Sequence, residues 1–289
     1  MADARKSLNQ LHAEWISCTA CDLGKRRKAV EGEFVRGEGM RGGIMFVGEG
    51  PGKDEEAFGR PFIGKSGAVL RKVLDKLQFT EHYMTNLVAC RSCAPAADAG
   101  GQPIFRKDFK TKQMLPLLRD EPPLPLQVEA CQQRLHEEIY IVDPVLIVAV
   151  GATAAKTLIG KSVSITDPDV RGQPFHITIP GAGFTTVRTD KRGVWARKAG
   201  GKLVMPVEPS EVRYLCIPTI HPAYVLRKLG DQSSDSPFMQ FAKDIQKAVQ
   251  VYERYMLELH GIVPSGVAEM AMEFQPEDSY DDEAEGATA

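Results

Sequence analysis

Short apolar runs alternate along the chain with longer amphipathic segments. Strands are predicted at four such runs, over 44–47, 83–89, 145–150 and 214–217. The third run is uniformly apolar and rich in β-branched residues, which is typical of a parallel strand buried on both faces. Apolar residues recur every three or four positions between the runs. Helices are therefore expected over 5–17, 66–78, 127–141, 152–159 and 237–259.

The alternation of strands and helices predicts an α/β fold, with three α/β/α layers around a central, mostly parallel four-stranded sheet. Two segments rich in glycine, proline and basic residues interrupt this rhythm, at about 94–126 and 161–211. We expect them to be insertions, because structureless loops of that length are uncommon inside a domain. Hairpin strands are expected in the second insertion, over 174–179 and 184–189. One domain, residues 1–260, would carry both insertions.

The charge of the chain is unevenly distributed. The 36 basic and 38 acidic side chains give a net charge of −2, but residues 273–289 contain seven acids and no base. The rest of the chain therefore carries +5, so the body is basic and the tail acidic. We expect residues 261–289 to form a solvated, disordered acidic tail. A tail that mimics nucleic acid is the alternative.

Composition narrows the class of protein. Hydrophobic residues make up 43% of the chain, enough to fill a globular core. No apolar run reaches the roughly 18 residues that a membrane span needs, and the first ten residues, MADARKSLNQ, lack the apolar stretch of a signal peptide. We therefore expect a soluble cytoplasmic protein, a monomer without a membrane partner.

The six cysteines include two CxxC pairs, Cys18 with Cys21 and Cys90 with Cys93. Metal binding is the better interpretation of such pairs in an intracellular protein. However, 68 residues separate the pairs, whereas a zinc ribbon has about 15–20. Zinc, an iron–sulfur cluster and no metal at all remain open on spacing alone. Cys216 lies in an apolar run and is expected to be a small buried hydrophobe.

Two segments carry candidate chemistry. The first, GEGPGKDEEAFGRPFIGKSG over 48–67, follows a predicted strand; its glycines allow a ligand close to the backbone, and Phe62 suits stacking on a planar ring. The alternative is a glycine-rich turn with Phe62 in the core. The second segment is HPAYVLR, His221–Arg227. His221 at a strand end suits stabilisation of developing negative charge, and a helix-capping histidine is the alternative.

Six segments in order resemble the uracil-DNA glycosylase superfamily, specifically its iron–sulfur-containing family 4. They are SCTACDLG (17–24), GEGPGKDEEAFGRPFIGKSG (48–67), TNLVACR (85–91), EACQQRL (129–135), VGATAAKTLIGK (150–161) and IHPAYVLR (220–227). The resemblance implies a DNA glycosylase that hydrolyses the N-glycosidic bond of a flipped-out pyrimidine, uracil, in base excision repair.

The resemblance also implies roles for individual residues. A [4Fe–4S] cluster would be held by Cys18, Cys21, Cys90 and Cys131, with Cys93 as a spare. Glu49 and His221 would be catalytic. The base would be bound by Gly50, Glu55, Phe62 and Asn86. DNA would be contacted by Lys65, Ser66, Leu226 and Arg227.

The sequence departs from the family pattern at both insertions, and at the 40 residues between Cys90 and Cys131. An enlarged pocket rim leaves an alternative substrate open, a bulkier hypermodified or glucosylated pyrimidine of phage DNA, removed in anti-phage defence. A second alternative is a non-catalytic or base-trapping DNA-binding protein. Base-trapping relatives carry a basic loop that ends in histidine, and TDKRGVW (189–195) lacks it. A nucleotide-binding Rossmann enzyme is disfavoured because GEGPGK matches neither glycine motif.

Overall fold

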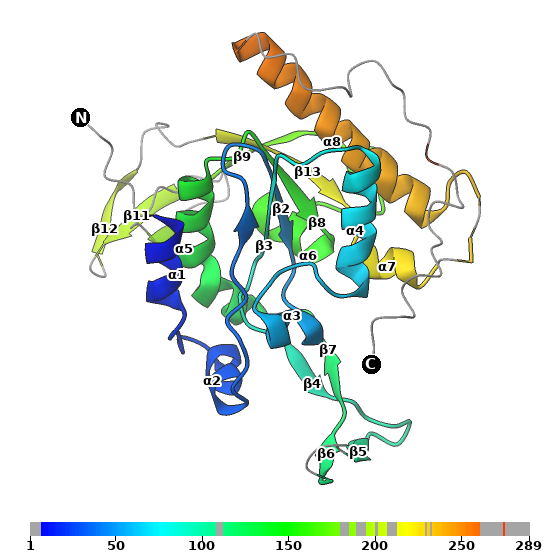
Figure 1. The fold of residues 1–289 in the computed structure, drawn as a ribbon. Coiled ribbons are helices and arrows are strands. Elements are labelled where there is room, and N and C mark those ends of the chain that lie inside the picture. The colour runs from blue at the N-terminus through cyan, green and yellow to red at the C-terminus, as the bar shows by residue number, and fades with distance from the viewer. Residues whose placement is uncertain are drawn as a thin grey trace.

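The computed structural model describes residues 7–107, 112–179, 185–188, 195–199, 202–206, 213–228, 230–231, 233–260 and 274. It is a three-layer α/β/α fold, with helices on both faces of a central sheet (Figure 1). This confirms the predicted fold class. The expected basic loop over 189–194 lies outside the described residues, as do all residues of the expected tail except Phe274.

The four predicted strands form the parallel centre of the sheet. They are β2 (Ile44–Gly48), β3 (His82–Asn86), β8 (Leu146–Val150) and β13 (Arg213–Thr219), in the spatial order β3-β2-β8-β13. Gly48 is paired with Asn86 and Thr219 with Val150. Because all four strands run the same way, their carboxyl ends meet at one edge of the sheet.

The sheet has two further strands at its edges, so the prediction of four strands was incomplete. β1 (Glu38–Gly39) pairs antiparallel with β3, and β9 (Phe175–Thr178) pairs antiparallel with β13, giving six strands. A two-residue strand leaves no periodic pattern to detect.

Strands are present at both predicted runs, 174–179 and 184–189, but they do not pair with each other as a hairpin. β9 pairs with β13 because its partner is set by the sheet edge rather than by the neighbouring run. β10 (Thr185–Arg188) instead pairs with β11 (Trp195–Ala199), which pairs with β12 (Lys202–Pro206). The second insertion therefore gives one edge strand to the main sheet and forms a separate three-stranded sheet.

Helices cover the two faces of the sheet. One face is covered by α4 (Lys65–Lys76), α7 (Pro222–Leu226) and α8 (Pro237–His260). The other is covered by α1 (Leu8–Trp15), α5 (Pro125–Val142) and α6 (Ala152–Leu158). Arg5 and Lys6, the first two residues of the helix expected over 5–17, lie outside the described residues.

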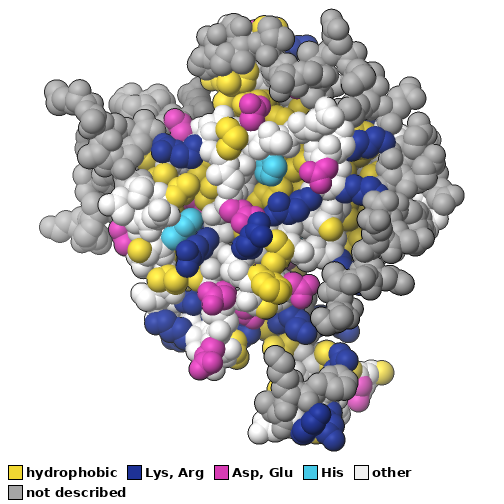
Figure 2. Space-filling model, viewed as in Figure 1, with side chains coloured by type: hydrophobic (Ala, Val, Ile, Leu, Met, Phe, Trp, Pro, Cys, Tyr) yellow, Lys and Arg dark blue, Asp and Glu magenta, His cyan; other side chains and the backbone are white. Residues whose placement is uncertain are grey.

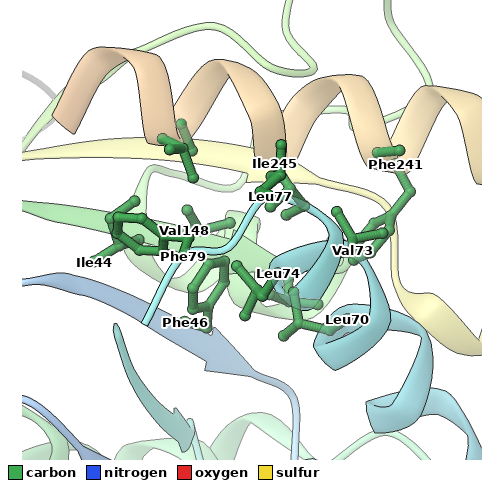
Figure 3. Close-up of a cluster of buried hydrophobic side chains, with 14 of the residues drawn as sticks. Ile44, Phe46, Leu70, Val73, Leu74, Leu77, Phe79, Val148, Phe241 and Ile245 are labelled. Atoms are coloured by element: carbon green, nitrogen blue, oxygen red, sulfur yellow. The ribbon is translucent and has the colours of Figure 1, made fainter. Parts of the chain in front are cut away.

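Successive side chains of β2 point to opposite faces of the sheet, so they pack in two separate cores, one under each layer of helices. Ile44 and Phe46 face the α4 and α8 layer, where Figure 3 shows Phe46 beside Leu74. Met45 and Val47 point to the opposite side and pack in the α5 and α6 layer. All four side chains are fully buried, which explains the continuous apolar run of this strand. Cys216 is buried in the second layer, as expected.

Several short elements were not predicted. α2 (Asp22–Ala29) and α3 (Lys53–Phe58) are too short to show an amphipathic pattern. The first insertion forms two small antiparallel ribbons, β4 (Cys93–Pro95) with β7 (Leu118–Asp120) and β5 (Phe105–Lys107) with β6 (Met114–Pro116). Phe274 packs edge-on against Phe238 in the core. No helix in the described part of the chain is both long and apolar enough to cross a membrane.

Candidate functional site

A cavity of about 910 Å³ lies where the parallel strands end. Glu49 directly follows β2, Asn86 ends β3, Gly151 directly follows β8, and His221 comes two residues after β13. Open α/β sheets bind ligands at this edge. The sequence-predicted residues that line the cavity are Glu49, Gly50, Glu55, Phe62, Ser66, Asn86, His221 and Arg227.

Two predicted DNA-contacting residues are not part of the cavity wall. Lys65 is exposed at the first position of α4, next to the lining residue Ser66. Leu226 is half-buried at the end of α7. Each is the sequence neighbour of a residue that lines the cavity, Ser66 and Arg227 respectively.

Phe62 is a buried aromatic residue held in an uncommon backbone conformation. Its φ of 54° lies in the left-handed region, which non-glycine residues rarely adopt. Arg71 supports it, donating from Nε to the Phe62 carbonyl at 3.0 Å. A Cβ on Gly67 would lie 2.1 Å from that same carbonyl oxygen, so glycine is required there. Strain of this kind, about 1–3 kcal/mol, concentrates at ligand sites.

Asn86 presents an unsatisfied amide to the cavity. The residue is 5% exposed, and its Nδ2 has no hydrogen-bond partner among the described residues. Its Oδ1 and the Phe62 ring both approach Gly48, whose Cβ would lie 2.3 Å and 2.8 Å from them. Glycine at position 48 therefore lets the amide and the ring share one corner of the cavity.

His221 is fixed as a hydrogen-bond donor. Its Nδ1 accepts from the backbone N–H of Ala223 at 3.1 Å, capping α7. Burial, assisted by the positive charge of Arg227, lowers the pKa of His221 to about 4. The ring is therefore neutral at pH 7 and its Nε2 carries the proton. The capping interpretation is thus confirmed for Nδ1, while the role of the other ring nitrogen as a donor to developing negative charge stays a prediction.

Glu49 and Glu55 differ in their partners. Glu49 accepts a hydrogen bond from the hydroxyl of Thr153 on α6. Glu55 accepts from the backbone N–H of Gly52 and caps α3. Burial raises the pKa of Glu55, while backbone N–H groups, among them that of Phe62, act against the shift. Glu55 therefore holds the shape of the glycine-rich loop.

Several lining residues were not among the predicted site residues. Tyr224 is 41% exposed on α7, and its ring lies 6.0 Å from the Arg227 guanidinium carbon. The two insertions supply much of the outer wall, through Asp120, Glu121, Pro122, Ile165, Thr166, Pro168 and Arg171. Only the folded structure brings these segments to the motif residues.

The four predicted metal-ligating cysteines gather around a second, small cavity. Cys18 and Cys21 precede α2, Cys90 follows β3, and Cys131 lies on α5; all four line a cavity of about 20 Å³. Cys93 does not line it. In the described part of the chain, no group of three or more potential ligands has the spacing of a formed metal site.

Two buried arginines adjoin the cysteine cavity. Burial raises the pKa of the Cys90 thiol to about 11, and the charge of Arg27 opposes this shift. Arg27 donates to the carbonyl of Ile16 at 2.7 Å. Burial lowers the pKa of Arg134, but the neighbouring Cys131 and Glu138 raise it overall, and Arg134 donates to the Asn86 carbonyl. Buried positive charge next to four thiols suits a centre made of thiolates, so the donor set and its surroundings fit an anionic iron–sulfur group.

The fold and the site together define an α/β protein with a cavity at the carboxyl edge of its sheet, lined by an aromatic ring, an amide without a hydrogen-bond partner among the described residues, and a histidine. The chain belongs to the uracil DNA glycosylase superfamily, whose family model matches residues 37–246. It is 32% identical over 233 residues to a type-4 uracil-DNA glycosylase of Thermotoga maritima, covering 79% of this chain and 88% of the relative.

A type-4 uracil-DNA glycosylase of Pyrobaculum aerophilum is 32% identical over 227 residues, which cover 76% of this chain and 85% of the relative. One of Sulfurisphaera tokodaii is 30% identical over 225 residues, covering 76% of each chain. These relatives confirm the family that the six sequence segments indicated.

Proposed function

We propose that this protein is a DNA glycosylase that hydrolyses the N1–C1′ bond of a uracil flipped out of DNA, as the first step of base excision repair. The observation that carries the proposal is the unpartnered Nδ2 of Asn86 in the cavity at the carboxyl edge. A buried donor without a partner costs about 1–3 kcal/mol. An amide both donates and accepts, so it can pair with O4 and N3–H of uracil.

Phe62 would stack on the extruded base. Stacking of a base on an aromatic side chain contributes about 1–3 kcal/mol. Extrusion itself costs a few kcal/mol, least for a mispaired base. The strained backbone of Phe62 and its support from Arg71 favour a ring that is already in position before the base arrives.

His221 would stabilise the leaving base. The base gains negative charge as the glycosidic bond breaks, and the neutral Nε2–H is directed by the Nδ1 bond to Ala223. A preorganised donor at a developing oxyanion contributes about 3–4 kcal/mol. Glu49 would stabilise the cation-like sugar or orient the attacking water, with Thr153 fixing its carboxylate.

We further propose that Cys18, Cys21, Cys90 and Cys131 hold a [4Fe–4S] cluster. Their common cavity and the neighbouring Arg27 support this assignment. The cluster would tie the loop before α2, the segment after β3 and α5 together, which is a structural role. No catalytic step needs it.

DNA contacts are proposed for the residues around the cavity mouth. Lys65 and Ser66 begin α4, and Leu226 and Arg227 end the short α7. Arg227 is exposed beside Tyr224. Leu226 or Arg227 would enter the duplex where the base leaves, and the remaining groups would bind phosphates.

The test is excision of uracil from a synthetic duplex by the purified protein and by Asn86→Ala, Glu49→Ala and His221→Ala. Each variant should lower the single-turnover rate. Asn9→Ala is the matched control, because Asn9 is exposed on α1 and does not line the cavity. Wild-type activity in all three site variants would refute the assigned roles.

A second candidate substrate is a bulkier modified pyrimidine. It is favoured by the outer wall, where Asp120 and Glu121 from one insertion and Thr166 from the other enlarge the cavity. Uracil, thymine, 5-hydroxymethyl and glucosylated pyrimidines should be compared in one duplex context. Excision of uracil alone would eliminate this candidate.

A further inference from the structure

The first insertion forms a projecting arm next to the cavity. We define the β4–β7 arm as residues 93–120. β4 pairs with β7 from Cys93 opposite Asp120 to Pro95 opposite Leu118. Figure 1 shows the arm extending from the α3 end of the body, with β5 and β6 at its far end. It gives the protein a surface that the compact sheet and its helices do not provide.

The arm is hydrogen-bonded along its length. Ala96 donates to the Leu117 carbonyl at 2.7 Å, and Leu117 donates to the Ile104 carbonyl at 2.8 Å. Ile104 in turn donates to the Ala96 carbonyl at 2.8 Å. These three bonds join the β4–β7 ribbon to the β5–β6 ribbon. The two ribbons therefore form one continuous element.

The base of the arm is anchored at the cavity rim. Arg91 Nε lies 2.5 Å from Asp120 Oδ1, and the backbone N–H of Glu121 donates to the Ser92 carbonyl at 3.0 Å. Asp120, Glu121 and Ser92 all line the cavity. The outer end of the arm thus has a defined position relative to the site, on a part of the rim distinct from α7.

The outer end combines exposed apolar side chains with positive charge. Phe105 is 53% exposed, Met114 58% and Leu115 44%. The described residues of this end, 104–107 and 112–117, include three basic residues, Arg106, Lys107 and Lys112, and no acid. Figure 2 shows Lys and Arg side chains beside hydrophobic ones at this end. The positive charge complements a polyanion, and the exposed Phe105 ring can stack on a planar base, so this composition suits DNA.

We propose that the β4–β7 arm binds the DNA strand that flanks the flipped nucleotide. Lys107, Lys112 and Arg119, all exposed, would contact phosphates, and Phe105 would stack on an unpaired base. The inference rests on the proposed function, because that function places DNA at the cavity mouth. Bases inside a duplex are stacked on one another, so Phe105 engages single-stranded DNA more strongly than duplex.

The test measures DNA affinity separately from chemistry. The probe is a fluorescein-labelled strand without uracil, alone and in duplex, titrated with full-length protein at several salt concentrations. The logarithm of the affinity falls linearly with the logarithm of the salt concentration. For the single strand, Lys107→Gln/Lys112→Gln should make this fall less steep by about 1.4, since each lost phosphate contact removes about 0.7 from the slope. Phe105→Ser should weaken single-strand binding about tenfold. Phe105→Tyr keeps an aromatic ring and should bind the single strand as tightly as wild type.

A matched control removes two charges elsewhere. Arg41 directly precedes the Gly42–Gly43 turn into β2, and Arg254 lies towards the end of α8; both are exposed. Arg41→Gln/Arg254→Gln should change the salt slope less than the arm variant does. Equal affinities and slopes for the arm and control variants would overturn the inference and favour a protein partner for the arm.

Uracil excision at saturating DNA separates this inference from the proposed function. Arm variants should keep the wild-type single-turnover rate while requiring more DNA to reach it. If the wild-type protein removes no uracil but its DNA affinity depends on the arm, the proposed function fails and arm binding stands. If uracil is removed and the arm variants bind DNA like wild type, only the arm inference fails.

Discussion

The hydroxyl of Thr153 donates a hydrogen bond to the carboxylate of Glu49. Thr153 lies in the first turn of α6 and Glu49 directly follows β2, and 104 positions separate them in the chain. The bond exists because β2 and β8 are neighbours in the sheet and end at the same edge. This hydrogen bond holds the Glu49 carboxylate in one orientation at the cavity.

Removing this hydroxyl should slow catalysis. A hydrogen bond to a charged group contributes about 1.5–3 kcal/mol, so Thr153→Val should lower the single-turnover rate of uracil excision about tenfold or more. Thr153→Ser keeps a hydroxyl and should retain most of the wild-type rate. Thr157→Val is the control, since Thr157 lies one turn further along α6 and bonds only the Thr153 carbonyl among the described contacts. An unchanged rate in Thr153→Val would show that Glu49 needs no support.

The lowered pKa of His221 predicts a particular pH dependence. With a pKa of about 4, the ring stays neutral through mildly acidic solution. The single-turnover rate should therefore be flat from about pH 8 to about pH 5 and fall below that, as Nδ1 gains a proton and loses its bond to Ala223. A rate that falls with a midpoint near the ordinary histidine pKa, about 6.5, would contradict a buried neutral donor.

The same pKa shift affects stability. The unfolded state has a histidine pKa of about 6.5 and binds more protons than the folded state between that value and about 4. The free energy of unfolding should therefore fall as the pH falls through this window. Urea unfolding should show less acid sensitivity in His221→Gln than in wild type. His176→Gln, at an exposed position on β9, should behave like wild type.

Glycine at position 48 should be essential for activity. A Cβ there would lie 2.3 Å from Asn86 Oδ1 and 2.8 Å from the Phe62 ring. Gly48→Ala should destabilise the fold by about 1–3 kcal/mol through overpacking. It should reduce excision about 100-fold, because both base-binding groups move. Gly230→Ala is the control, since its Cβ would meet nothing within 4 Å. Full activity in Gly48→Ala would contradict the prediction that displacing Asn86 and Phe62 slows excision.

Substitution of single cysteines should distinguish the possible metal centres. Cys131→Ser should lose bound iron and sulfide, while Cys93→Ser should retain both, because only Cys131 lines the common cavity. Metal and sulfide analysis of anaerobically purified protein is the measurement. Stoichiometric zinc that is lost in Cys93→Ser but kept in Cys131→Ser would instead support a site made of the two CxxC pairs.

Much of the fold was predictable because its central strands are buried on both faces. Continuous apolar runs such as β8 need no partner information to be recognised. β1 and β9 were different, because an edge strand is defined by the strand it joins. The pairing of β9 with β13 rather than with a following strand depends on a long-range contact that local pattern does not encode.

The residues of the candidate site also fall into a group that the sequence predicted and a group that it did not. Glu49, Asn86 and His221 stand at predicted strand ends, and parallel strands bring such ends together. Tyr224 and Asp120 had no such signal, because their place in the cavity wall depends on how α7 and the β4–β7 arm lie against the sheet. Glu55 was expected to bind the base, and its carboxylate accepts the backbone N–H of the neighbouring loop.

By itself, the sequence determined the α/β class, the parallel centre of the sheet and the identity of the motif residues. Apolar periodicity and local glycine and proline chemistry are properties of neighbouring residues. Only the tertiary structure decided which ring nitrogen of His221 faces the cavity, that Asn86 keeps an unpaired donor, and that Thr153 holds Glu49. These features depend on contacts between distant segments, which form only when the core brings the strands and helices together.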